Sequence, residues 1–221
     1  MVTPSLHRRV RAARRGVVAL VAVAAAGLLT QLPLASASFT SSTGNGSNAF
    51  QAASSFCPTP GSTTLPVTND TMVVQTSPTT NYQSAAPLMV QARTGDVRRM
   101  FVRPTLATIP ARCTLTGAVL TLTVNSFSAR TYGVYRVGAA WAIGTINWNN
   151  QPAPTGAAAV ASTTDVTFSV DVTAQVQGLY QVANDGLMIR DQTEGTATTF
   201  TNSYASLNSA SGAPAVTFTW G

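Results

Sequence analysis

The chain has 221 residues, of which only 9% are charged, and it carries 13 arginines, no lysine and a single histidine, His7. Its formal net charge is +6, with seven acidic residues. A protein without lysine has no Schiff-base amine, no Ser-Lys dyad and no phosphate-binding P-loop lysine, which excludes those classes of enzyme. The length suits one domain with a sizeable core once an N-terminal targeting segment is set aside.

The first 37 residues have the layout of a signal peptide. Five arginines between Arg8 and Arg15 precede an apolar run from Val17 to Leu29, and the small-residue triplet Ala35-Ser36-Ala37 follows. A membrane-spanning helix needs about 20 apolar residues, and this run is shorter. We therefore expect export and cleavage after Ala37, which leaves the rest of the protein outside the cytoplasm. The alternative is an uncleaved segment that acts as a membrane anchor.

Removal of residues 1–37 changes the charge balance of the protein. His7 and five arginines leave with this segment, so that eight arginines face seven acids. The exported chain is nearly neutral and lacks the basic surplus that binding to a phosphate backbone requires, which excludes nucleic acid as a partner. It also lacks an imidazole for a hydrolytic triad, a zinc site or general-base catalysis.

Residues 38–66 are rich in Ser, Thr and Gly and show no helix or strand periodicity, which predicts a flexible leader. This leader contains Cys57, and Cys113 is the only other cysteine. In an oxidising compartment the two cysteines predict one disulfide. The alternative is a pair of buried free thiols. A catalytic cysteine is disfavoured because no neighbouring base is evident.

From Val67 to the C-terminus, short apolar runs alternate with turn residues. Leu120, Leu122 and Val124 alternate with polar residues, which predicts half-buried antiparallel strands. The sequence thus predicts an all-β domain over residues 67–221, an antiparallel β-sandwich or jelly roll. The predicted strands cover residues 71–75, 87–92, 98–103, 114–124, 131–137, 145–148, 165–170, 186–190, 198–203 and 215–220.

One segment has helical rather than strand periodicity. Val172, Val176, Leu179 and Tyr180 recur with the spacing of one helix face, directly after Asp171. We therefore predict one short helix across an end of the sheets, with Asp171 as its N-cap.

Several motifs follow one another in a recognisable order. They are Asn69-Asp70-Thr71, Ser77-Pro78-Thr79-Thr80-Asn81-Tyr82, the Arg99 to Arg103 strand, Ile109-Pro110, and Trp141 followed by Thr145 to Pro152. This order resembles the DNRLRE domain family from about Val67 to Trp220. The resemblance implies an extracellular β-sandwich of the carbohydrate-binding-module kind. The chain departs from the family at Gln83, at Pro104-Thr105 and at Tyr204, where the family has a glutamate, so the fold transfers more directly than any ligand or ion site.

Sugar-binding sites combine exposed aromatic rings with amide and guanidinium groups. Trp141, Trp148 and Trp220 lie at strand positions of the family pattern, so we expect them in the framework. The candidates for ligand binding are therefore the tyrosines Tyr82, Tyr132, Tyr135 and Tyr204. No cofactor is predicted apart from calcium, for which Asp70 and Asp171 are the candidate ligands.

These features predict a secreted, non-catalytic module, either released or retained at the cell surface, that binds an extracellular or cell-wall polysaccharide. An alternative is a structural cell-surface or matrix-fibre component, because residues 38–50 are similar to the stretch after the signal peptide in some bacterial matrix-fibre subunits. A polysaccharide-degrading enzyme is less favoured, since no spacing marks a pair of catalytic carboxylates. We expect a monomer or weak self-association, and membrane contact only through an uncleaved signal.

Overall fold

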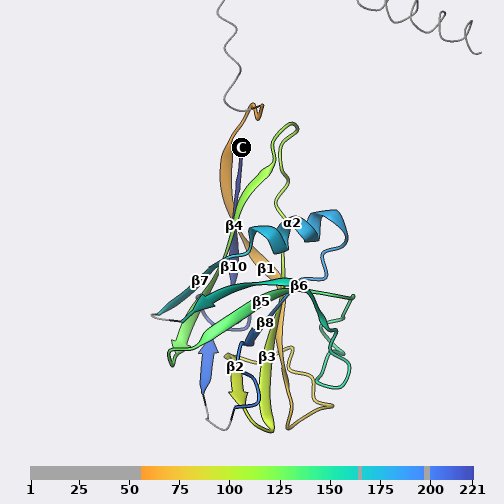
Figure 1. The fold of residues 1–221 in the computed structure, drawn as a ribbon, viewed down its shortest axis with the longest axis vertical. Coiled ribbons are helices and arrows are strands. Elements are labelled where there is room, and N and C mark those ends of the chain that lie inside the picture. Colours follow the sequence, from red (N-terminus) through yellow and green to blue (C-terminus); the bar gives the residue numbers. More distant parts are fainter. Residues whose placement is uncertain (1–55, 164–165, 197–199) are drawn as a thin grey trace, which may run out of the picture. The chain divides into compact units, whose positions relative to one another are not determined.

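The computed structural model describes residues 56–163, 166–196 and 200–221, which form two packed layers of antiparallel strands and one short helix (Figure 1). The predicted all-β sandwich is confirmed. The predicted signal peptide at residues 1–37 and most of the predicted leader at 38–66 lie outside the described residues. Within the described part of the chain, no helix is long and apolar enough to cross a membrane.

The first sheet contains four strands in the order β1, β10, β4, β7. Their bounds are β1 (Gly61–Val74), β10 (Ala215–Trp220), β4 (Leu115–Ser126) and β7 (Thr167–Asp171). Leu120, Phe168 and Phe218 lie on the buried side of this sheet, whereas Thr and Ser residues alternate on the other side. The predicted period-two pattern is thus confirmed in β4, β7 and β10.

The second sheet is larger, and five of its strands lie side by side in the order β6, β5, β8, β3, β1. β2 pairs with the start of β3, and β9 pairs with β2 and with the end of β4. Their bounds are β2 (Leu88–Arg93), β3 (Asp96–Pro104), β5 (Thr131–Val137), β6 (Pro154–Ser162), β8 (Leu187–Asp191) and β9 (Thr201–Tyr204).

Two strands belong to both sheets. β1 pairs with β10 through residues 61–66 and with β3 through residues 67–74. β4 pairs with β10 and β7, and its end at Val124 and Ser126 pairs with β9. β1 begins at Gly61, earlier than the domain start expected at Val67, because its Ser- and Thr-rich first half lies along the edge of the first sheet.

The main core fills the space between the two sheets. Its centre contains Tyr132, Phe168 and Tyr204, whose rings meet edge to face with centroids 5.8 to 6.3 Å apart. Edge-to-face contacts of this kind stabilise by about 0.5–1.5 kcal/mol each beyond the burial of the rings.

A second apolar cluster lies on the opposite, outer side of the second sheet. Val73, Phe101, Val137 and Met188 form its base, and the loop at residues 138–153 covers them with Trp141 and Ile146. The framework role predicted for the tryptophans is confirmed: Trp141 is 9% exposed, Trp148 packs against this cluster, and Trp220 packs against the main core.

The predicted helix is α2 (Thr173–Gln181), and Val172, Val176 and Leu179 enter the main core. Tyr180 keeps 39% of its surface exposed, but its hydroxyl donates to the carbonyl of Ala107 at 2.5 Å. The N-cap is Val172, so the role predicted for Asp171 is wrong by one residue. Asp171 instead accepts hydrogen bonds from the amide and hydroxyl of Thr173.

Two strand predictions differ from the structure. Residues 145–148 are not a strand, because Ile146 and Trp148 anchor a turn-rich loop on the outer cluster. The strand β6 was not predicted, since Pro154–Ser162 contains four alanines and a glycine, which have low strand propensity. The hydrogen bonds to β5 hold this segment in a strand conformation that its own sequence does not favour.

The predicted disulfide joins Cys57 to Cys113, and its two cysteines are 56 positions apart in the sequence. It links the segment before β1 to the turn before β4. No other cysteine is present in the chain.

Candidate functional site

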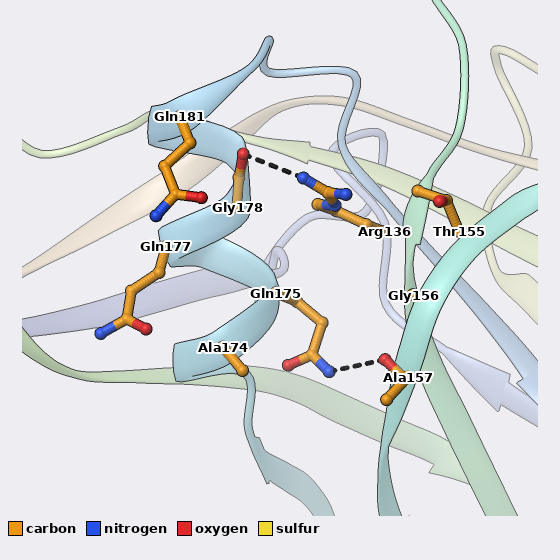
Figure 2. Close-up of a pocket in the computed structure, with 9 residues that line it drawn as sticks. All are labelled: Arg136, Thr155, Gly156, Ala157, Ala174, Gln175, Gln177, Gly178 and Gln181. Atoms are coloured by element: carbon orange, nitrogen blue, oxygen red, sulfur yellow. Dashed lines mark hydrogen bonds between the residues drawn. The ribbon is translucent and has the colours of Figure 1, made fainter. Parts of the chain in front are cut away.

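A pocket of about 330 Å³ lies between α2 and the β5–β6 hairpin (Figure 2). Arg136 reaches from β5 to the helix, where Nη1 donates to the carbonyl of Gly178 at 3.1 Å. Gln175 reaches in the opposite direction, and Nε2 donates to the carbonyl of Ala157 in β6 at 2.9 Å. These two contacts hold the helix against the hairpin.

A second pocket, of about 310 Å³, lies beside an ion pair at the other end of the same hairpin. Arg130 donates to both carboxylate oxygens of Asp191 at 2.8 Å, and the Asp191 side chain is only 2% exposed. Asp191 also accepts from the amide of Thr193. Both charges are therefore committed to joining β8 to the start of β5.

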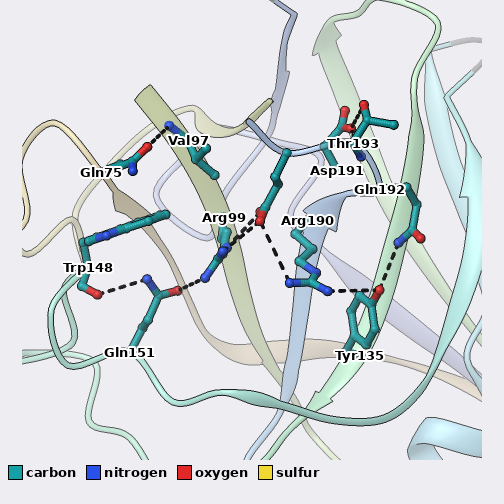
Figure 3. Close-up of polar contacts among 11 residues, drawn as sticks. Gln75, Val97, Arg99, Tyr135, Trp148, Gln151, Arg190, Asp191, Gln192 and Thr193 are labelled. Carbon is teal, nitrogen blue, oxygen red and sulfur yellow. Dashed lines mark hydrogen bonds and ion pairs between the residues drawn. The ribbon is translucent and has the colours of Figure 1, made fainter. Parts of the chain in front are cut away.

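A connected network of polar side chains lies on the outer side of the second sheet (Figure 3). We call it the platform and define it as Arg99, Tyr135, Trp148, Gln151, Arg190, Gln192 and Glu194. Its members come from β3, β5, β8 and two loops, yet they form one continuous chain of contacts. The platform thus depends on the pairing of β3 with β8 and of β8 with β5.

The centre of the platform is an arginine and carboxylate pair. Arg99 donates through Nε and Nη2 to the two oxygens of Glu194, at 2.8 and 2.7 Å, and through Nη1 to Gln151 Oε1 at 3.1 Å. Arg190 Nη1 lies 3.9 Å from Glu194 Oε2. Because one carboxylate serves two guanidinium groups, the local charge of the platform is positive.

The ring faces of the platform are covered by guanidinium groups. The Arg99 guanidinium carbon lies 4.8 Å from the centre of the Trp148 ring, and that of Arg190 lies 4.6 Å from the Tyr135 ring. Such stacking stabilises by about 0.5–1 kcal/mol at exposed sites and fixes the plane of each guanidinium. The platform therefore combines N–H donors and amides with two rings that each carry a guanidinium over them.

Tyr135 connects the platform to Gln192. Its hydroxyl accepts from Gln192 Nε2 at 3.1 Å and from Arg190 Nη2 at 3.4 Å. Desolvation acts to raise the pKa of Tyr135, but these two hydrogen bonds and the charge of Arg190 together lower it. A Cβ at Gly133 would lie 2.0 Å from Gln192 Nε2 and 2.7 Å from the Tyr135 ring, so glycine at this position leaves the room in which both side chains lie.

The loop that carries Trp148 and Gln151 is held by the motif around Asn81. Asn81 Nδ2 donates to the carbonyls of Ile143 and Ile146, both at 2.8 Å. The amide of Asn149 donates to the carbonyl of Pro78 at 3.1 Å. The turn before β2 therefore positions one end of the platform.

The four tyrosines expected to bind ligand fall into different environments. Tyr132 and Tyr204 are fully buried in the main core, where a sugar has no access in this structure. Tyr82 is partly buried against the same core. Tyr135 alone of the four belongs to the platform. Ligand binding by these residues stays a prediction.

Of the platform residues, the sequence predicted only Tyr135 as a site residue. It missed Arg99, Trp148, Gln151, Arg190, Gln192 and Glu194. Arg99, Phe101 and Arg103 alternate with apolar residues of the core face in β3, and this spacing does indicate an outer face that carries arginines. The remaining members come from separate segments, and only the strand order brings them together.

The calcium candidates Asp70 and Asp171 lie on different elements, β1 and β7. Asp70 is buried and accepts a hydrogen bond from the amide of Leu207 at 2.7 Å. Asp171 accepts a hydrogen bond from the amide of Thr173. Among the residues that the structure describes, no group of three or more His, Cys, Asp or Glu side chains is placed to hold a metal ion. Calcium binding at either residue stays a prediction.

Asp70 should make the stability of the protein depend on pH. Burial raises the pKa of Asp70 above its ordinary value of 3.8, and the hydrogen bond from Leu207 opposes this less strongly. Because the pKa is higher in the folded state, the contribution of Asp70 to the free energy of unfolding is largest below pH 3.8 and is lost as the pH rises through the folded-state pKa.

We therefore expect wild type to lose stability relative to Asp70→Asn as the pH rises above 3.8 and through the higher folded-state pKa. The asparagine Oδ1 still accepts from Leu207, so the variant keeps the loop contact without the titration. Urea unfolding of both proteins across this range measures the difference. A difference in the free energy of unfolding that stays constant with pH would contradict the raised pKa of Asp70.

Comparison with known protein families identifies the domain. The chain matches the model of carbohydrate-binding module family 96 over residues 61–219, which runs from the start of β1 into β10. Comparison with curated proteins finds no significant match. The carbohydrate-binding-module character implied by the sequence resemblance is confirmed, while the DNRLRE name stays a prediction. Since the match covers most of the sequence, the chain belongs to carbohydrate-binding module family 96.

Proposed function

We propose that the protein is an exported, non-catalytic module that binds an extracellular or cell-wall polysaccharide through the platform. The observation that carries this proposal is the continuous chain of guanidinium, amide and phenol groups across three adjacent strands. Membership of a carbohydrate-binding module family supports glycan as the ligand. The disulfide between Cys57 and Cys113 is compatible with an extracellular location.

The platform suits hydrogen bonding to sugar oxygens. The stacked arginines and Gln151 already have fixed positions, so little side-chain entropy is lost when a ligand binds. Arg190 and Gln192 are the more accessible members, since the Arg190 side chain is 31% exposed and Gln192 is exposed. We therefore assign to these two the direct contacts with the polysaccharide, and to Arg99 and Glu194 the positioning of Arg190.

The partners of five of the seven acidic residues support a non-catalytic role. Glu194 is paired with Arg99, Asp191 with Arg130, and Asp96 with Arg98. Asp70 and Asp171 each accept a backbone amide. A glycosidase instead needs two carboxyl groups that flank an open substrate site.

The test is a glycan array combined with pull-down on insoluble polysaccharides, followed by titration of the best ligand. We expect the double variant Arg190→Ala/Gln192→Ala to bind at least tenfold more weakly, because a charge-assisted hydrogen bond contributes about 1.5–3 kcal/mol and a tenfold change corresponds to about 1.4 kcal/mol. Arg93→Ala is the matched control, since it removes the same charge from an exposed position at the end of β2, outside the platform.

Two results would overturn the proposal. One is the absence of glycan binding by wild type, above all if the protein assembles into ordered polymers that disappear when residues 38–55 are deleted, which would replace it with the structural role. The other is equal loss of affinity in Arg93→Ala and in the platform variant. Hydrolysis of any polysaccharide on the panel by wild type would contradict the non-catalytic part.

A further inference from the structure

The α2 pocket, bounded by Arg136 and Thr155 on the hairpin and by Gln175 and Gln181 on the helix, is separate from the platform. Arg136 directly follows the platform residue Tyr135 in β5, where the pairing with β6 shifts register between Val134 and Arg136. The two residues nevertheless make contacts in different places. Tyr135 bonds to Arg190 and Gln192, whereas Arg136 bonds to the helix.

Small residues form the floor of the α2 pocket. Ala174 and Gly178 lie one turn apart on α2, and Gly156 and Ala157 face them from β6. A Cβ at Gly178 would lie 2.6 Å from Arg136 Nη1, so glycine at this position allows the guanidinium to lie against the helix. A Cβ at Gly156 would meet nothing within 4 Å, which shows that the space above the hairpin is open.

Uncommitted hydrogen-bonding groups surround this floor. Arg136 uses only Nη1 in the contact with Gly178, so its Nε and Nη2 have no hydrogen-bond partner among the described residues. The same holds for the Thr155 hydroxyl and the Gln181 amide, while Gln175 Oε1 keeps its acceptor capacity. The pocket thus offers both donors and acceptors, as a hydroxyl-rich ligand requires.

The charge around the α2 pocket favours a neutral ligand. Arg136 is the only charged residue in its lining. Its guanidinium lies against a carbonyl near the end of α2, and the C-terminal end of a helix carries about half a negative charge. The charge of the arginine is therefore partly compensated within the protein. The volume of about 330 Å³ is at the lower end of the range for ligand pockets, about 300–1,000 Å³, which suits a small ligand.

We propose that the α2 pocket is a second glycan subsite that holds one neutral sugar unit. This inference rests on the proposed function and adds a site on the opposite flank of β5. The pocket selects for hydroxyl groups through Arg136, Thr155, Gln175 and Gln181, and its floor of Ala174 and Gly178 contacts the carbon face of the sugar ring.

The experiment is side-chain amide NMR of the full chain titrated with D-glucose, D-galactose, D-mannose and N-acetylglucosamine, with D-glucuronate as the charged comparator. We expect at least one neutral sugar to shift the Gln181 side-chain amide, and D-glucuronate to do so at least tenfold more weakly. Ala174→Phe fills the pocket from an exposed helix position and should weaken this binding at least tenfold. Ala111→Phe, at an exposed turn elsewhere, should leave it unchanged.

The platform variant Arg190→Ala/Gln192→Ala separates this inference from the proposed function. The Gln181 shift should persist in that variant, because the pocket does not use either residue. If wild type binds polysaccharide but no neutral sugar shifts Gln181, or if Ala174→Phe has no effect, the second subsite is refuted and the platform proposal stands. If wild type binds no glycan of any kind, both fail.

Discussion

Replacement of both Cys57 and Cys113 by serine should lower the free energy of unfolding by about 4 kcal/mol. The bond closes a loop across 56 positions, and the chain-entropy model assigns about this value to the freedom that the unfolded chain regains without it. Urea unfolding of wild type and of the double variant measures the difference. The serine pair leaves no free thiol, so the comparison is not complicated by new disulfides.

Reduction of wild type with a thiol reagent provides the control. It should lower the midpoint of wild type to that of the serine variant and leave the variant unchanged. A loss below about 1 kcal/mol in both measurements would contradict the expectation, and would mean that the unfolded chain keeps residual structure that restricts this loop without the bond.

Gly186→Ala should destabilise the protein by about 3 kcal/mol or more. Gly186 precedes β8 with φ of +85°, a region that costs other residues about 1–2 kcal/mol, and its Cβ would lie 2.5 Å from the carbonyl oxygen of Val102 in β3. That oxygen belongs to the backbone of a paired strand, so relief of the clash must shift β3 or β8, at a further cost of about 1–3 kcal/mol.

The same structure offers a control for the backbone part of this effect. Gly95 also has positive φ, +76°, but a Cβ there would meet nothing within 4 Å. Gly95→Ala should therefore cost about 1 kcal/mol, for the conformation alone. Thermal or urea unfolding of the two variants isolates the clash as their difference. Equal losses would show that the approach of Val102 has no energetic consequence.

The fold follows from the sequence wherever a strand has one buried and one exposed face. β4, β7 and β10 are of this kind, since Leu120, Phe168 and Phe218 alternate with polar residues. β6 could not be predicted in this way because alanine is tolerated on either face, and the strand exists through its pairing with β5.

The candidate site was less predictable because a strand pattern does not reveal which face is covered by a loop. Tyr132 and Tyr135 are three residues apart in β5 and therefore point to opposite faces of the sheet, but the pattern does not tell which face packs in the main core and which carries the platform. Likewise, the spacing of Ile146 and Trp148 is typical of a strand, but both residues belong to a loop that covers the outer cluster. These assignments depend on the position of the 138–153 loop, which is fixed by Asn81 from a distant segment.

The sharing of β1 and β4 between the two sheets has a consequence for how the protein folds. Neither sheet can form or separate completely without strands that also belong to the other, so we expect a single cooperative unfolding transition in which amides of both layers exchange with similar protection. The pairing also joins the two ends of the domain, β1 with β10. Such distant pairings slow folding, which places this domain among proteins that fold in milliseconds to seconds.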